Sequence, residues 1–131
     1  MNWVEQVIAE FGSQIGIYDL NLDADGSIRL DMDDESSFGI IYQSQRNSDE
    51  VIVYRSIRAA YFGKMQYKEA LRLSCINKPR LWPLQAAFNQ QELMLAFRIP
   101  ERAFMLSSLE QALIELREIQ KRIEDGSYSM G

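Results

Sequence analysis

Phe38-Gly39-Ile40-Ile41-Tyr42 and Val51-Ile52-Val53-Tyr54 are two nearby stretches in which almost every residue is apolar. Because successive side chains of a strand point to opposite faces of a sheet, both stretches predict strands with apolar surface on each side. A small antiparallel sheet covered by helices on one side is instead expected to be polar on the other. The sequence therefore predicts a second apolar surface that something else must cover. The residues expected on it are Ile41, Ile52, Tyr54, Met94 and Ala96.

The flanking sequence predicts an α+β fold. Apolar residues recur at the spacing of one helical face in residues 2–14, in residues 64–77 and from Ser107 or Ser108 to residue 123. Apolar and polar alternation, or apolar runs between turn residues, predict strands at 28–33, 38–44, 50–57, 82–88 and 92–99. The resulting order, α-β-β-β-α-β-β-α, indicates one antiparallel sheet with flanking helices.

Composition limits the classes of protein to which the chain can belong. The 131 residues are 47% hydrophobic and 25% charged, which predicts a single folded domain over residues 1–125 with a flexible tail at 126–131. A net charge of −5 disfavours binding to nucleic acids and to anionic membranes. No stretch is long enough to span a membrane, and the first residues have no basic, signal-like segment. We therefore expect a cytoplasmic protein.

The residue types needed for catalysis are scarce. The chain has no histidine, and Cys75 is its only cysteine, so a histidine-based triad and a Cys/His metal site are both excluded. The acidic residues Asp31, Asp33, Asp34 and Glu35 are better interpreted as a solvated strand end, because no neighbouring group is placed to separate their pKa values. We expect no enzyme activity, no cofactor and no bound metal.

Residues 21–28 resemble the first eight positions of an EF-hand calcium loop. The twelfth position of such a loop should be a glutamate that binds calcium through both oxygens, and here it is Met32. A loop without that ligand binds calcium poorly. The stretch is therefore better interpreted as a turn, marked by Asp25-Gly26, that leads into the first strand.

Three stretches share their apolar pattern with a known family. They are Met1-Asn2-Trp3-Val4-Glu5-Gln6-Val7-Ile8 with Phe11, the hairpin from Trp82-Pro83-Leu84 to Leu95-Ala96-Phe97, and the final helix with Leu109, Leu113 and Leu116. In these features the chain resembles a class I type III secretion chaperone of the CesT/Tir-chaperone-like family, and most closely the SycN-like gatekeeper chaperones. The resemblance covers nearly the whole chain.

This resemblance implies a non-enzymatic bacterial chaperone that binds the N-terminal segment of a secreted effector or gatekeeper protein and keeps it competent for export. It also implies a homodimer, or a heterodimer with a sister chaperone, formed largely through the middle helix. The expected dimer residues are Tyr67, Leu71, Ser74 and Cys75. The expected client-binding residues are Trp3, Val7, Phe11, Ile41, Ile52, Tyr54 and Met94.

Two other interpretations are compatible with the sequence. One is an adaptor domain of the same fold without a role in secretion, as in YbjN-like bacterial domains. The other is a module that binds a small molecule or calcium. This interpretation is supported only by the incomplete loop at residues 21–28.

Overall fold

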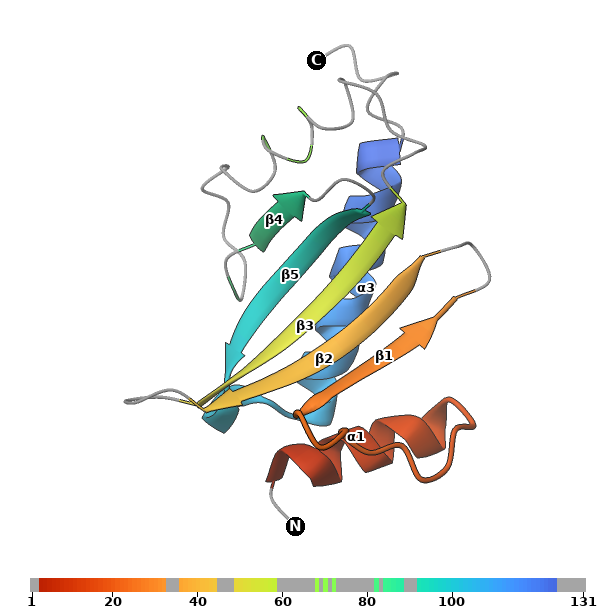
Figure 1. Cartoon of the computed structure of the whole chain (residues 1–131), viewed down its shortest axis with the longest axis vertical. Coiled ribbons are helices and arrows are strands. Elements are labelled where there is room, and N and C mark those ends of the chain that lie inside the picture. The colour runs from red at the N-terminus through yellow and green to blue at the C-terminus, as the bar shows by residue number, and fades with distance from the viewer. Residues whose placement is uncertain are drawn as a thin grey trace.

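The computed structural model describes residues 3–32, 36–44, 49–58, 68, 70, 72, 82, 84–88 and 92–124. Its elements are α1 (Trp3–Gln14), β1 (Ser27–Asp31), β2 (Ser37–Ser44), β3 (Asp49–Arg58), β4 (Leu84–Phe88), β5 (Glu92–Pro100), the 3-10 helix η2 (Glu101–Ala103) and α3 (Leu106–Glu124). The strands form one antiparallel sheet in the order β1-β2-β3-β5-β4 (Figure 1). The helix α3 crosses one face of this sheet, and α1 lies beside β1.

The predicted strands all form, with small differences at their ends. The first ends at Asp31 rather than at residue 33. The fourth begins at Leu84 rather than at Trp82, which lies in a bend and packs its ring against Phe97, with 6.1 Å between ring centroids. The last helix begins at Leu106, slightly earlier than predicted. Residues 68, 70 and 72 are helical, and the rest of the predicted middle helix lies outside the described residues.

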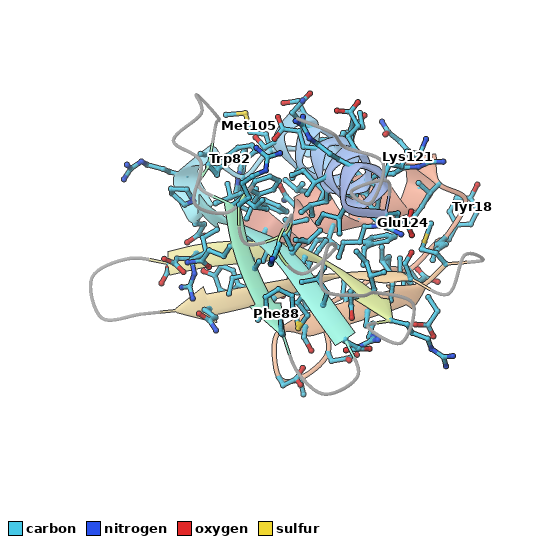
Figure 2. The ribbon with its side chains drawn as sticks, turned by 90° about the horizontal axis from the view of Figure 1, so that it is seen from above. Tyr18, Trp82, Phe88, Met105, Lys121 and Glu124 are labelled. Atoms are coloured by element: carbon cyan, nitrogen blue, oxygen red, sulfur yellow. The ribbon has the colours of Figure 1, made fainter. Side chains whose placement is uncertain are left out.

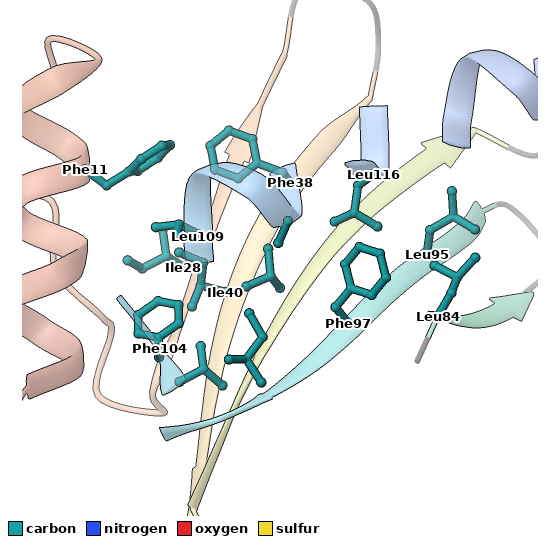
Figure 3. Packing of buried hydrophobic residues seen from close by; sticks show 14 of the residues in the cluster. Phe11, Ile28, Phe38, Ile40, Leu84, Leu95, Phe97, Phe104, Leu109 and Leu116 are labelled. Atoms are coloured by element: carbon teal, nitrogen blue, oxygen red, sulfur yellow. The ribbon is translucent and has the colours of Figure 1, made fainter. Parts of the chain in front are cut away.

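One row of apolar side chains runs across all five strands on the face toward the helices. The strand register pairs Ile28 with Ile40, Ile40 with Val53, and Val53 with Phe97, and it pairs Phe97 with Leu84 on β4. All five side chains are buried. Figure 3 labels four of them: Ile28, Ile40, Phe97 and Leu84. Each large apolar side chain that is buried in this way contributes roughly 1.5–3 kcal/mol to stability.

The two helices cover this row with matching apolar stripes. The buried apolar side chains of α3 recur every three or four residues, at Leu109, Ala112, Leu116, Ile119 and Ile123. Those of α1 are Val4, Val7, Ile8 and Phe11. The ring of Phe11 meets that of Phe38 edge-on, with 6.0 Å between centroids (Figure 3). In the described part of the chain, no helix is long and apolar enough to cross a membrane.

The opposite face of the sheet is apolar in the middle and charged around it, as the two-sided strands predict. Ile41, Ile52 and Met94 point to this side and are half-buried. Two ion pairs lie near them on the same face. Arg29 Nη2 lies 3.0 Å from Glu92 Oε1, and Arg98 Nη1 lies 2.8 Å from Glu50 Oε2. Figure 2 shows α3 on the other side of the sheet.

Tyr54 lies flat on this opposite face, over Gly39. The two residues are directly paired between β2 and β3, and Tyr54 is 6% exposed. A Cβ atom added at Gly39 would overlap the ring and the hydroxyl of Tyr54. Glycine is therefore needed here for space, which explains a residue that otherwise weakens a strand.

We predict that Gly39→Ala destabilises the protein by about 1–3 kcal/mol, because the added methyl group overpacks against Tyr54. Without this contact, alanine within a strand would stabilise by about 0.5–1 kcal/mol relative to glycine, so the sign of the change is the test. Urea denaturation followed by circular dichroism measures it. The double variant Gly39→Ala/Tyr54→Leu should lose less free energy of unfolding than the two single variants lose together. A more stable Gly39→Ala variant would show that the contact is absent.

Candidate functional site

A groove of about 440 Å³ lies where α1, β1, β2 and α3 come together. We call it the α1–β1–α3 groove. Its floor consists of apolar side chains that also pack against the core: Phe11, Leu30, Phe38 and Leu113. Its walls are Ile15, Ile17, Met32 and Ile114, and its charged residues are Asp31, Arg55 and Arg117.

Exposed apolar side chains are concentrated at this groove. Ile15, Ile17, Met32 and Ile114 are each between 39% and 53% exposed. The described part of the chain has only four other large apolar side chains that are exposed: Trp3, Tyr18, Phe88 and Met105. Tyr18 follows Ile17 directly and projects from the molecule (Figure 2). Single exposed apolar residues are normal, whereas a contiguous group in a concave site indicates a binding surface.

The end of α1 creates one wall of the groove. Ile17 N donates to the carbonyl oxygen of Gly12 at 2.8 Å, and Gly16 N donates to that of Ser13 at 3.3 Å. Gly16 has a φ of +82°, in the left-handed region that favours glycine. This is a Schellman motif, which ends the helix and turns the chain back along it. The turn places Ile15 and Ile17 side by side at the mouth of the groove.

The outer edge of β1 lies beside the groove and is available for strand pairing. Met32 N donates to Ser36 O, and Tyr42 N donates to Gly26 O, both at 2.8 Å. Because hydrogen-bonded pairs alternate along an antiparallel ladder, the main-chain groups of Arg29 and Asp31 point away from β2. In the described part of the chain, no strand pairs with this edge. An unpaired edge is a template for an added strand.

A buried arginine forms part of the groove's inner wall. Arg55 is 6% exposed, and its Nε donates to Gln120 Oε1 on α3. One terminal nitrogen of Arg55 donates to Ser36 Oγ at 3.0 Å. Gln120 Nε2 in turn donates to Glu124 Oε2 at 3.2 Å. Arg55 therefore ties β3 to α3 and is one of the three charged residues that line the groove.

A smaller, polar pocket of about 260 Å³ lies on the opposite face of the sheet. Arg29 donates to Glu92 Oε1 there at 3.0 Å. This hydrogen bond lowers the pKa of the Glu92 carboxyl group and raises the pKa of the Arg29 guanidinium group. Asp31 also lies 3.7 Å from Arg29 Nε. Because these charges pair with one another, the pocket is less suited than the groove to an apolar ligand.

The loop that resembles a calcium site is a turn into β1. Ser27 donates to Asp25 Oδ1 through its main-chain nitrogen at 3.2 Å and through its hydroxyl at 2.8 Å. Gly26 N closes the turn on the carbonyl oxygen of Asp23 at 2.9 Å. The turn interpretation is therefore confirmed. Among the described residues, no three acidic or cysteine side chains gather as they would around a metal ion.

The residues predicted to bind the client lie in several places. Only Phe11 lines the groove. Val7 is buried in the core, and Trp3 is exposed at the other end of α1, where its Nε1 donates to Phe104 O at 2.6 Å. The remaining four lie on the opposite face of the sheet: Ile41, Ile52, Tyr54 and Met94. Their roles stay predictions, as do those of Tyr67, Leu71, Ser74 and Cys75, which lie outside the described residues.

Most walls of the groove are formed by residues that the sequence pattern does not mark as binding residues. Ile17 follows the predicted helix, and Met32 is predicted as part of the first strand and as the twelfth position of the calcium-like loop, not as a binding residue. Ile114 stands beside Leu113 but outside the apolar stripe of the last helix. An isoleucine on the polar side of an amphipathic helix is the one signal in the sequence that could have pointed to this surface.

Comparisons with known proteins were made for both sequence and fold. The family model of the type III secretory system chaperone SycN matches residues 3–124. The comparison with curated proteins found no match. A chain in the crystal structure of the ExsC–ExsE complex has a TM-score of 0.71 and 17% identity, covering 94% of this chain and 95% of that chain.

Two further solved structures have the same fold. One contains the Yersinia pestis type III secretion chaperone SycH in complex with a stable fragment of YscM2, with a TM-score of 0.69, 12% identity, and coverage of 92% of this chain and 98% of that chain. The other is the HopA1–SchA chaperone–effector complex, with a TM-score of 0.71, 10% identity, and coverage of 92% and 91%. These likenesses confirm the predicted α+β fold.

We predict that Arg55→Ala lowers the free energy of unfolding by about 2–3 kcal/mol, because it leaves the buried side chains of Gln120 and Ser36 without this donor. Arg98→Ala is the control. Arg98 is paired with Glu50 at the surface, so its loss should cost less than about 1 kcal/mol. Urea denaturation of the two variants checks the difference. Equal losses would mean that Arg55 does not connect β3 to α3.

Proposed function

This chain belongs to the type III secretory system chaperone SycN family, and we propose that it binds the N-terminal segment of a secreted effector or gatekeeper protein and keeps it competent for export. The observation that supports this role is the α1–β1–α3 groove, whose exposed apolar walls lie beside the unpaired edge of β1. We further propose that the protein acts in the bacterial cytoplasm and has no enzyme activity. Holding a client needs surface complementarity and no catalytic group.

We propose that the client adds a strand to β1. The main-chain groups of Arg29 and Asp31 would form its hydrogen bonds, and every second client side chain would enter the groove between Ile17, Met32 and Ile114. Main-chain pairing of this kind is insensitive to client sequence, whereas the groove selects for apolar side chains. An extended segment bound in this way cannot form the structure it would adopt after export.

The energies indicate that one groove alone holds a client weakly. A buried apolar anchor contributes roughly 1.5–3 kcal/mol, and each new hydrogen bond adds a net of about 1 kcal/mol. Ordering each client residue costs about 1–2 kcal/mol in backbone entropy alone. The gain per residue is therefore small, and useful affinity requires contacts over a long segment. We infer that the client extends beyond the groove onto further apolar surface.

The opposite face of the sheet is the second apolar surface of the chain. Ile41, Ile52 and Met94 are half-buried there. We propose that this face contacts either more of the client or a second chaperone subunit, and that the dimer forms through the middle helix as the family resemblance implies. The four predicted dimer residues are Tyr67, Leu71, Ser74 and Cys75. Light scattering at micromolar concentration measures whether the chain forms a dimer by itself or with a sister chain.

We predict that Ile114→Asp weakens client binding at least about tenfold, because it places a carboxylate against apolar side chains of the client. Met105→Asp is the matched control, since Met105 is 48% exposed, close to the 53% of Ile114, and lies outside the groove. The assay is calorimetric titration with the N-terminal segment of the protein that co-purifies with this chain from its host. Equal effects of the two changes would contradict binding in the groove.

We also predict that the amide protons of Arg29 and Asp31 exchange quickly in the free protein and slowly in the complex. These amides point away from the sheet until a client strand accepts their hydrogen bonds. Hydrogen–deuterium exchange read by NMR measures both residues with and without the same client segment. The amides of Ile28 and Leu30, which face β2, serve as the control and should be protected in both states. Unchanged exchange at Arg29 and Asp31 would exclude strand addition at β1.

A further inference from the structure

We infer that the α1–β1–α3 groove selects a client segment that has an acidic side chain beside its apolar residues, and that Arg117 binds this side chain. The inference rests on the proposed function and goes further, because it states a charge requirement for the client. Arg117 lines the groove with Leu113 and Ile114 and is exposed. A guanidinium group that borders apolar surface is suited to a carboxylate, which it can bind with two parallel hydrogen bonds.

Arg117, on α3, lacks the carboxylate partners that two arginines of the sheet have. Arg29 pairs with Glu92, and Arg98 pairs with Glu50. In the described ranges of the chain, no carboxylate lies within ion-pairing distance of Arg117. Its own helix supplies none either, because the residues one turn away are Leu113, Ile114, Gln120 and Lys121. The charge at Arg117 is therefore available to a ligand.

The charged residues of the groove favour an anion although the whole chain is acidic. Two arginines, Arg55 and Arg117, and one aspartate, Asp31, line the groove, which gives it a formal charge of +1. Asp31 also lies 3.7 Å from Arg29. The net charge of −5 repels an acidic client at long range, but physiological salt screens such effects beyond about 8 Å. Local pairing with Arg117 therefore determines which segment stays in the groove.

Strand geometry specifies where the acidic residue must lie in the client. Side chains of an added strand alternate between the two faces, so residues that enter the groove are separated by two positions, about 7 Å apart. We therefore expect the acidic residue two or four positions from an apolar anchor. An odd separation would place it on the other face of the strand, away from Arg117.

Peptide selection against the whole chain tests this inference. The probe is a displayed library of 12-residue peptides with valine, isoleucine or leucine fixed at two positions four residues apart and all other positions varied. We expect peptides selected by the wild type to be enriched in aspartate or glutamate at even separations from the fixed residues. This enrichment should disappear with Arg117→Glu and with the milder Arg117→Gln. It should persist with Arg102→Glu, which makes the same charge change on the exposed η2, outside the groove.

Fluorescence anisotropy on one selected peptide then measures the pairing. Replacing its acidic residue by lysine should weaken binding to the wild type about tenfold, and Arg117→Glu should recover most of this loss. Selection of apolar peptides without acidic enrichment, or a lysine peptide that binds equally well, would overturn the inference while leaving the proposed function in place. Light scattering adds one further outcome: if Arg117→Glu dissociates a dimer of the wild type, the groove holds a second copy of the chain and the inference fails.

A separate variant distinguishes failure of the proposed function. Ile114→Asn makes the groove polar without adding a charge one turn from Arg117, so it should abolish selection of these peptides. If the Ile114→Asn chain selects the same peptides with the same acidic preference, the peptides bind elsewhere and the groove is not the client site. Thermal unfolding of each variant followed by circular dichroism shows that the comparison is made between folded proteins.

Discussion

The apolar row across the sheet is the constraint on which the rest of the structure depends. Ile28, Ile40, Val53, Phe97 and Leu84 come from five strands and lie on one face only when every strand is in its observed register. A shift of any strand by one residue would turn its apolar side chains to the opposite face. The row therefore sets the register, and it provides the surface on which the apolar stripes of α1 and α3 pack.

The groove arises from how these two helices cover the sheet. α3 packs mainly over β3, while α1 lies beside β1 and meets α3 over a short length only. Between them, the half-buried Leu30 and the buried Phe38 form the floor of the groove, and the turn after α1 adds Ile17 to its rim. Apolar side chains left exposed in this way would favour aggregation, and the net charge of −5 opposes it. Although the protein is negatively charged overall, Arg117 gives the groove a local positive charge.

The elements of the fold could be predicted because each depends on neighbours in the sequence. Alternation in Ile28, Leu30 and Met32 and the two-sided strands around Ile41 and Ile52 were sufficient to predict β1 to β3. The start of β4 differed from the prediction: Trp82 lies in a bend before the strand and packs its ring against Phe97. The groove could not be predicted, since its walls come from separate elements whose distance depends on how the helices pack.

The sequence by itself determined the strands, the helical stripes, the absence of histidine chemistry and the presence of apolar surface on both sides of the sheet. Periodicity and composition are local properties, and they require no knowledge of the packing. Only the tertiary structure decided which apolar residues stay exposed. It buried Tyr54 against Gly39 and left Ile114 open, because burial depends on which side chains meet in space.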